Sequence, residues 1–317
     1  MIKVLVVGGA GYVGGAVVDR LKGTYDVRVF DNLLYEDTYL KKVDFVRGDI
    51  LDSKKLQAHL DWAEVVVWLA AFVGDPACAV NPGLTFDVNV GSVRYLADNF
   101  DGRIIFPSTC SVYGAQDGLL DEESPTNPLS IYASSKLEAE KLLIEHGNAL
   151  IFRLGTLFGT SDDYSRLRVD LVVNVLTIRA KIEGVMRVFG GEQFRPLLHV
   201  KDVANAIAPN ITRSTEGIFN LHAENLTIRN VAERIHKVVP ESRIEYTETT
   251  FQDSRNYKVS SRKAESLLGF SPHYSVEDGI LEIANLVDSG RITDFANPRF
   301  TNVEIIRLRE KKSHEKL

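Results

Sequence analysis

The sequence predicts an α/β protein with a doubly wound parallel sheet and a smaller mixed α/β lobe that follows it. Three observations predict this class. Short β-branched runs alternate with longer amphipathic segments through the first half, a glycine-rich loop follows the first run, and the regularity lapses in the second half. The 317 residues, 44% hydrophobic and 25% charged, suffice for one large or two unequal domains.

Six strands and four helices are expected in the regular first half. The strands are expected at residues 2–7, 27–30, 43–46, 65–69, 103–106 and 149–154, and the helices at residues 12–22, 53–60, 82–100 and 132–146. This order is typical of a doubly wound sheet whose ligand crevice lies at the carboxyl ends of the strands. Functional residues are therefore expected in the loops that follow strands.

The alternation ends after Gly155, where a stretch rich in Gly, Ser and Asp leads to an expected helix over residues 168–182. We expect the first domain to span residues 1–157, joined by about 197–222, and a smaller substrate-binding lobe to span residues 158–317. The tail from residue 307 is dense in Lys, Arg and Glu, which predicts a solvated helix that frays at its end.

Charge and composition narrow the classes of partner. The 37 Lys and Arg residues against 43 Asp and Glu give a net charge of −6, which disfavours nucleic acid and anionic membranes as partners. No stretch approaches the roughly 20 apolar residues that cross a bilayer, and the first apolar run lacks a cleavage-site pattern. Cys78 and Cys110 match no disulfide or zinc spacing. We expect a cytoplasmic protein without a metal.

The loop from Gly8 to Gly14 is the first candidate binding site. It follows the first strand and opens the first helix, so that Gly8 permits a tight turn, Gly11 lets backbone approach a pyrophosphate, and Gly14 lets the helix pack on the strand. This context predicts a Rossmann-like dinucleotide site. The residues expected to contact the cofactor there are Gly8, Gly11, Tyr12, Val13 and Gly14.

Three later strand ends extend this prediction. Asp31, at the end of the second strand, can accept hydrogen bonds from both adenosine ribose hydroxyls and repel a 2′-phosphate, which favours NAD over NADP. Taken alone, Asp31 fits equally well the interpretation of a residue that only turns the chain at a strand end. Taken together with the glycine loop, the interpretation of a ribose-binding residue is favoured. The further cofactor residues expected at these ends are Asn32, Asp49, Ile50, Ala70 and Ala71.

Tyr132 and Lys136 are the candidate catalytic pair. Four residues apart on a helix, they share one face, and the Lys ammonium is expected to lower the pKa of the Tyr phenol toward that of a general acid/base. An ordinary exposed Tyr and Lys would show the same spacing. The position decides for catalysis, because the pair follows the fifth strand and a hydroxyl-rich loop, residues 108–114, that opens at the same crevice.

Together these residues resemble the extended short-chain dehydrogenase/reductase family, and more narrowly its NAD-dependent nucleotide-sugar epimerases and dehydratases. The resemblance covers nearly the whole chain. It implies that Tyr132 is the catalytic acid/base, that Lys136 tunes it and holds the nicotinamide ribose, and that Thr109 is the third catalytic member. It also places Asn89 in the cofactor site and implies a homodimer formed by the helices over residues 82–100 and 132–146.

The resemblance leaves several reactions open. Family 4,6-dehydratases carry Asp and Glu where this chain has Cys110 and Ser111, so dehydration is disfavoured. A 4-epimerase that works by reversible hydride transfer through a 4-keto-sugar is favoured. The alternatives are a 4-dehydrogenase or 4-ketoreductase, for example on a GDP-heptose, and a non-catalytic NAD-binding regulatory protein. A catalytic Cys110 is less expected than a small, buried and inert one.

The residues expected to bind a nucleotide-diphosphate sugar are fewer and less specific. By the resemblance, Arg195 grips the substrate diphosphate, although Pro196 replaces the Asp that usually follows it. A second family Arg is replaced by Thr250, and Arg255 is its candidate substitute. Thr156 stands where 4-epimerases commonly have Asn. The run from Tyr164 to Arg168 is similar to the GDP-heptose branch, so Arg166 or Arg168 is expected to reach a phosphate or a sugar substituent.

His199 has no metal partners at suitable spacing and is expected to be packed and hydrogen-bonded.

Overall fold

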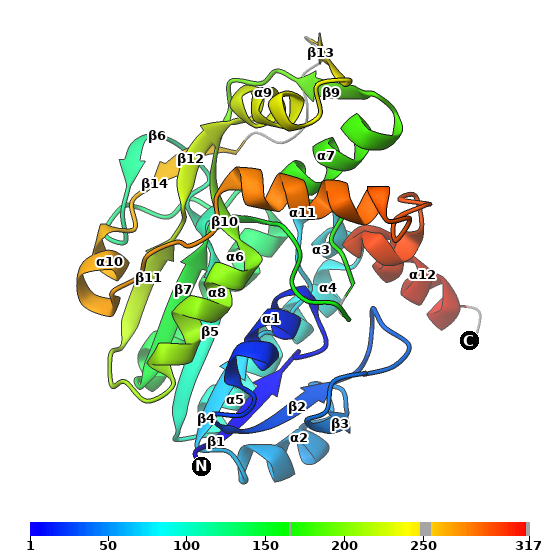
Figure 1. Ribbon diagram of the computed structural model, residues 1–317. Coiled ribbons are helices and arrows are strands. Elements are labelled where there is room, and N and C mark those ends of the chain that lie inside the picture. Colours follow the sequence, from blue (N-terminus) through cyan, green and yellow to red (C-terminus); the bar gives the residue numbers. More distant parts are fainter. Residues whose placement is uncertain (165, 248–254, 315–317) are drawn as a thin grey trace.

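Seven parallel strands form the central sheet of the computed structural model, which describes residues 1–164, 166–247 and 255–314 (Figure 1). Each neighbouring pair of strands in this sheet is parallel. In spatial order the strands are β11 (Gly217–Leu221), β7 (Ala149–Leu154), β5 (Arg103–Thr109), β4 (Val65–Trp68), β1 (Lys3–Val7), β2 (Asp26–Asp31) and β3 (Asp44–Arg47). The six expected strands are confirmed, and β11 adds a seventh from the second half of the chain.

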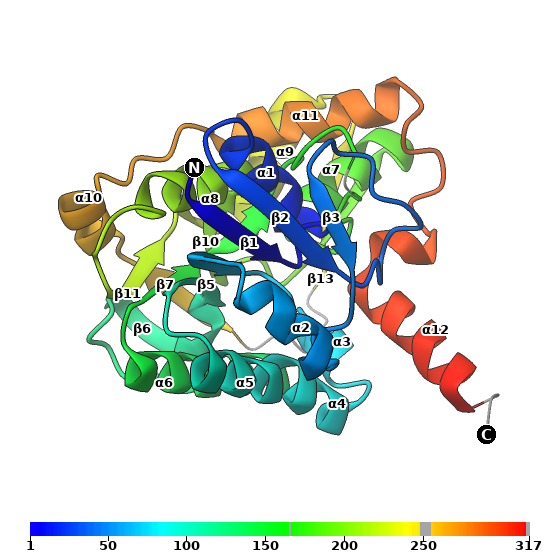
Figure 2. The same ribbon diagram turned by 90° about the horizontal axis from the view of Figure 1, so that it is seen from below.

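Helices cover both faces of this sheet (Figure 2). One face packs against α1 (Tyr12–Leu21) and α8 (Val200–Ile207) through an aliphatic core. The other packs against α2 (Ser53–Leu60), α5 (Ser92–Asn99) and α6 (Ile131–His146). Because both faces are covered, β1, β4 and β7 are buried along almost their whole length, as all-parallel sheets require.

The helix expected over residues 82–100 is confirmed but is not continuous. It consists of α4 (Pro82–Phe86), a π-helical turn at Asp87–Gly91 and α5. A short helix, α3 (Asp75–Cys78), precedes it. Helix α6 begins where expected, because the Ser130 side chain accepts a hydrogen bond from the backbone N–H of Ala133.

A smaller lobe lies beyond the carboxyl ends of the strands. Its core packs α7 (Val172–Ile182), α9 (Ile228–Val238) and α11 (Val276–Asp288) against β9 (Val185–Phe189) and β10 (Phe194–His199). The expected helix over residues 168–182 begins only at Val172, because Arg168 and Asp170 pair with each other through their side chains at the cavity wall. The remaining elements are β6 (Ala115–Leu120), β8 (Thr156–Phe158), β12 (Glu224–Thr227), β13 (Arg243–Thr247), β14 (Asn256–Val259) and α10 (Arg262–Leu268).

The last segment of the chain returns to the sheet. A single 3₁₀ turn (Pro298–Phe300) leads into α12 (Asn302–His314), which lies beside α3 (Figure 2). Ile306 of α12 is fully buried in the same hydrophobic core as Phe30, Trp68 and Ala77. Within residues 1–164, 166–247 and 255–314, no helix has the length and apolar character that a membrane span needs.

Candidate active site

A cavity of about 650 Å³ opens at the carboxyl ends of the strands, between the sheet and the smaller lobe. Its size is within the range of small-molecule sites. The structure brings all but one of the predicted site residues to its wall. These are Gly8, Gly11, Tyr12, Val13, Gly14, Asp31, Asn32, Asp49, Ile50, Ala70, Ala71, Thr109, Tyr132, Lys136, Thr156, Arg166, Arg168, Arg195 and Arg255.

The glycine loop leaves no room for side chains. Gly8 has a φ of +86°, and a Cβ there would lie 2.5 Å from the backbone nitrogen of Ala70. A Cβ on Gly14 would lie 2.5 Å from the carbonyl oxygen of Gly8. The bare backbone at the start of α1 therefore faces the cavity, which is the arrangement that a dinucleotide pyrophosphate needs.

Asp31 both shapes this loop and lines the cavity. Its carboxylate accepts hydrogen bonds from the backbone N–H of Ala10 at 3.0 Å and of Leu33 at 2.7 Å. Burial raises the pKa of the carboxyl group, although these two bonds oppose the shift. The turn-forming role and the cavity-facing role are therefore compatible, because each carboxylate oxygen can accept a second hydrogen bond.

Asn89 is the exception among the predicted cofactor residues, and it lies outside the cavity wall. Its Oδ1 accepts from the backbone N–H of Phe72 at 2.8 Å, and its Nδ2 donates to the Phe72 carbonyl at 2.9 Å and to Ser135 Oγ at 3.0 Å. The side chain is 2% exposed. Asn89 thus ties the loop after β4 to α6, and its direct contact with the cofactor stays a prediction.

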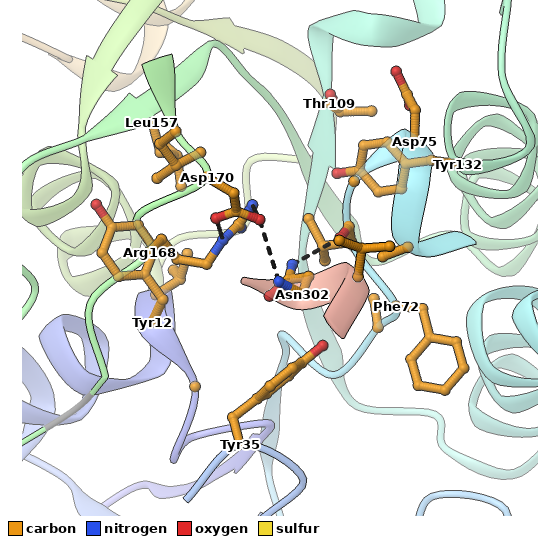
Figure 3. Close-up of a pocket in the computed structure, with 18 of the residues that line it drawn as sticks. Tyr12, Tyr35, Phe72, Asp75, Thr109, Tyr132, Leu157, Arg168, Asp170 and Asn302 are labelled. Atoms are coloured by element: carbon orange, nitrogen blue, oxygen red, sulfur yellow. Dashed lines mark hydrogen bonds and ion pairs between the residues drawn. The ribbon is translucent and has the colours of Figure 1, made fainter. Parts of the chain in front are cut away.

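The predicted catalytic residues meet at one end of the cavity. Tyr132 lies on the first turn of α6, Lys136 lies on the next turn, and Thr109 ends β5 (Figure 3). Thr109 lies close enough to Tyr132 for its hydroxyl to oppose the rise in the Tyr132 pKa. The Lys136 ammonium lies 3.7 Å from the centre of the Phe106 ring. The structure therefore brings the three predicted catalytic side chains to one cavity.

The pKa of Tyr132 is not lowered as expected. Burial raises it, and the Cys78 and Asp75 side chains add to that shift, whereas the Thr109 hydroxyl opposes it. Burial also lowers the pKa of Lys136 to about 7. Burial therefore favours the neutral form of both side chains. This effect is larger than the attraction between a Lys136 ammonium and a Tyr132 phenolate that the i, i+4 spacing predicts.

A buried ion pair supports this end of the cavity from behind. Glu140, one turn after Lys136 on α6, pairs with Arg153 of β7 at 2.7 Å and accepts a hydrogen bond from Ser108. Cys110 lies beside this pair, and its thiol donates to the Arg153 carbonyl at 3.2 Å. Cys110 is fully buried, is not part of the described cavity wall, and has a pKa raised by burial. Cys110 is therefore a small, buried side chain, as expected, and its lack of a catalytic role stays a prediction.

A second polar cluster lines the middle of the cavity (Figure 3). Arg168 pairs with Asp170 through contacts of 2.6 and 3.0 Å. The Arg166 guanidinium donates to the Arg299 carbonyl at 2.8 Å and to the side chain of Asn302, and it lies 3.8 Å from the centre of the Tyr35 ring. Both predicted arginines are therefore held in place before any ligand binds.

Asp75 is a cavity residue that the sequence did not reveal. Its carboxylate accepts from Ser130 Oγ at 2.6 Å and lies 3.3 Å from Arg255, which also donates to Ser111 at 3.2 Å. Arg195 in turn donates to the Arg255 carbonyl. Asp75 begins the short helix α3, which follows the loop after β4, so its position after a strand was the available signal. Thr250 lies outside the described residues.

His199 is a packed residue, as predicted. It is fully buried, its Nε2 lies 3.0 Å from Glu282 Oε2, and its Nδ1 accepts from the backbone N–H of Lys201. Across the described part of the chain, no three His, Cys, Asp or Glu side chains are grouped so that they could hold a metal ion.

The parallel sheet, the glycine loop and the Tyr132–Lys136 pair define an enzyme of the NAD-binding oxidoreductase type. Residues 4–221 match the family described as the NAD dependent epimerase/dehydratase family, and the chain belongs to it. Its cofactor is therefore NAD.

Relatives and solved structures agree with this assignment. The chain is 28% identical over 324 residues to the UDP-glucose 4-epimerase of Lacticaseibacillus casei, covering 89% of this chain and 96% of that protein. It is 27% identical over 303 residues to UDP-glucuronic acid decarboxylase 1 of Arabidopsis thaliana, covering 88% and 68%. The NAD complex of the Thermus thermophilus UDP-glucose 4-epimerase is similar with a TM-score of 0.78 and 25% identity, covering 92% of this chain and 100% of that one.

Proposed function

We propose that this enzyme is a nucleotide-sugar epimerase that acts at C4 of the sugar. The observation that carries the proposal is the meeting of Thr109, Tyr132 and Lys136 in one cavity with the glycine loop. Cys110 and Ser111 lie where a dehydratase needs acidic residues, and the buried Cys110 thiol offers no acid for the loss of water. Relatives named as UDP-glucose 4-epimerases support the same reaction.

The residues of the glycine loop fit NAD. The bare backbone from Gly8 to Gly14 would hold the pyrophosphate, Asp31 the adenosine ribose, and Lys136 the nicotinamide ribose. Bound NAD supplies reversible hydride transfer at the sugar carbon. Asp49 would face the adenine, because it lies at the edge of the cavity after β3.

Tyr132 carries the proton in this proposal. Its Oη takes the proton of the sugar C4 hydroxyl while Thr109 donates a hydrogen bond to the same oxygen, and a 4-keto-sugar forms. Tyr132 enters this step as the phenolate and leaves it as the neutral phenol, so Lys136 would stabilise the phenolate before the proton is taken. Tyr132 returns the proton after the sugar presents its other face. The nucleotide diphosphate would be held by Arg195 and Arg255, with Arg166 and Arg168 nearby and Thr156 beside the sugar.

The test is the variant Tyr132→Phe, assayed against UDP-, GDP-, CDP- and dTDP-sugars. We expect turnover to fall by at least about 100-fold, the usual contribution of a general acid/base, while NAD affinity stays within about threefold. Tyr95→Phe is the matched control, because Tyr95 lies on α5 and bonds Gln57 away from the cavity. Full activity of Tyr132→Phe would contradict the mechanism.

A net change in NADH absorbance during turnover separates the two reactions that the site allows. An epimerase returns its hydride to the sugar, so absorbance at steady state stays constant. A steady rise or fall would instead assign a 4-dehydrogenase or a 4-ketoreductase, for which the same three catalytic side chains serve.

We also propose that the enzyme is a cytoplasmic homodimer formed through α4, α5 and α6. These helices lie side by side on one face (Figure 2). Phe86 and Ile144 on this face are 41% and 54% exposed, as apolar side chains at a subunit contact would be in a single chain. Light scattering should give twice the chain mass of 35.3 kDa. A monomeric mass at micromolar concentration would contradict the dimer.

A further inference from the structure

The end of the chain forms part of the cavity wall. Asn302, Val303 and Arg309 of α12 line the cavity although they are almost 300 residues from the glycine loop. We call residues 298–309 the C-terminal clasp. Its position beside the sheet follows from Ile306, which is fully buried in the same core as Phe30 and Trp68.

Asn302 fastens the clasp through three hydrogen bonds to three different segments. Its backbone N–H donates to Asp170 at 3.3 Å, its Nδ2 donates to the Val73 carbonyl at 2.7 Å, and its Oδ1 accepts from Arg166. The side chain is 3% exposed. Because its amide is fully used by protein partners, Asn302 acts on the cavity through the groups that it holds.

The clasp covers the nucleotide-binding end of the cavity rather than the substrate lobe. Arg309 lies 3.7 Å from Asp49 after β3, and Arg299 pairs at 2.9 Å with Glu36 after β2. Arg195 and Arg255 lie instead on β10 and next to β14. Arg299 and Arg309 of the clasp thus contact the segments after β2 and β3, which carry Asp31 and Asp49, while Asn302 binds Arg166, Asp170 and Val73.

The groups held under the clasp fit a ligand that carries negative charge. Arg166 and Arg168 are 5% and 9% exposed and share Asp170, and burial together with Arg168 lowers the pKa of Arg166 to about 10. The buried Tyr35 hydroxyl has no hydrogen-bond partner among the described residues, and it points toward the cavity centre (Figure 3). Two buried guanidinium groups that share one close carboxylate, beside the unpaired Tyr35 hydroxyl, offer hydrogen-bond donors that suit a phosphate oxygen.

We propose that the C-terminal clasp is part of the cofactor site, covering the adenosine diphosphate half of NAD, and that it must detach before NAD can leave. The inference rests on the NAD site assigned above and on neither the sugar nor the reaction.

Hydrogen–deuterium exchange tests where the clasp acts. Addition of NAD⁺ to the whole protein should slow exchange of amides in α12, whereas UDP or GDP alone should leave them unchanged. Protection by the nucleoside diphosphates and not by NAD⁺ would overturn the proposal and assign the clasp to the substrate. NAD⁺ binding without protection of α12 would overturn it as well, while absence of NAD⁺ binding would overturn the proposed function together with the clasp.

The rate of NADH release tests whether the clasp limits cofactor exit. NADH fluorescence is followed after the loaded protein is mixed with excess NAD⁺. Asn302→Ala removes two side-chain hydrogen bonds and should release NADH about tenfold faster, and Arg309→Ala should release it about threefold faster. Arg309 is a surface-accessible residue, so its variant reports even where Asn302→Ala does not fold.

Arg307→Ala is the matched control for these release rates. Arg307 lies on α12, is 58% exposed at its side chain and pairs with Glu304 on the solvent side. Its variant should release NADH at the wild-type rate. Wild-type release from folded Asn302→Ala and from Arg309→Ala would overturn the proposal, as would equal acceleration by Arg307→Ala.

Discussion

At the scale of single residues, the cavity places Tyr132, the proposed acid/base, in an environment that opposes ionisation. Tyr132 is partly buried, desolvation raises its pKa, and Asp75 adds a negative charge nearby. Thr109 and Arg168 act in the opposite direction. The net direction favours the protonated phenol over the phenolate.

Asp75→Asn tests this balance through the pH profile. The Asp75 carboxylate raises the pKa of Tyr132, so its neutral replacement should lower that pKa. Oxidation of the sugar needs the phenolate, so the rising limb of the kcat/KM profile should move to lower pH. The amide oxygen of the replacement side chain can still accept from Ser130, so the start of α6 is kept.

Ser130→Ala separates the charge from the hydrogen bond in that experiment. It removes the bond to Asp75 and the cap of α6 but leaves the carboxylate, so the rising limb should stay near its wild-type pH. A limb that moves to higher pH in Asp75→Asn, or that moves equally in both variants, would contradict the electrostatic role of Asp75.

At the scale of elements, local sequence patterns predicted a strand or helix correctly where the element's own residues determine its type. The six apolar runs predicted six strands because strands of an all-parallel sheet are buried on both faces. The start of α7 was placed four residues early, since the pairing of Arg168 with Asp170 is a side-chain event that periodicity does not encode. The π-helical turn at residues 87–91 was missed for a related reason, because it accompanies the buried bonds of Asn89 to Phe72 and Ser135.

Gly14→Ala tests the packing of α1 on the glycine loop. The added Cβ would lie 2.5 Å from the Gly8 carbonyl oxygen, so backbone must shift at the point where the pyrophosphate is expected. We expect a loss of about 1–3 kcal/mol in the free energy of unfolding, as for overpacking elsewhere, and a fall in NAD affinity of at least about tenfold. Urea unfolding and NADH fluorescence titration measure the two effects.

Gly83→Ala is the control for that substitution. Gly83 lies within α4, and an added Cβ would meet only the Asn81 side-chain oxygen at 3.7 Å. Alanine in a helix is expected to stabilise the protein by a few tenths to about 1 kcal/mol and to leave NAD affinity unchanged. Wild-type affinity in Gly14→Ala would contradict the role of the glycine loop.

At the scale of the whole molecule, the parts of the site that sequence predicted are those close to a strand end. The end of β2 carries Asp31, Asp49 comes just after β3, and Tyr132 lies in α6. Each of these elements has a clear local sequence pattern. Asn302 carries no such signal, because long-range folding brings it to the cavity, whereas Tyr35 follows β2 by four residues and only this position could have indicated it. Asn89 was placed at the cofactor from its motif, and its side chain bonds Phe72 and Ser135 in the interior.

The chain path also joins the two lobes into one unit. Strand β11 leaves the second half to extend the sheet beside β7, and Ile306 of α12 anchors the end of the chain in the core of the sheet. The Tyr12 hydroxyl of α1 also donates to the carbonyl of Gly159, just after β8, at 2.7 Å. The smaller lobe is therefore bracketed by segments whose packing depends on the sheet.

This arrangement predicts a single unfolding transition that responds to NAD. At 100 times its dissociation constant, NAD⁺ should add about 2.7 kcal/mol to the free energy of unfolding of the whole chain. In calorimetry this one transition should move to a higher temperature. Its calorimetric enthalpy should equal its van't Hoff enthalpy. Two separated transitions, of which NAD⁺ moves only one, would show that the smaller lobe unfolds independently of the sheet. NADP⁺ at the same concentration is the control, since Asp31 should exclude its 2′-phosphate and leave the transition unmoved.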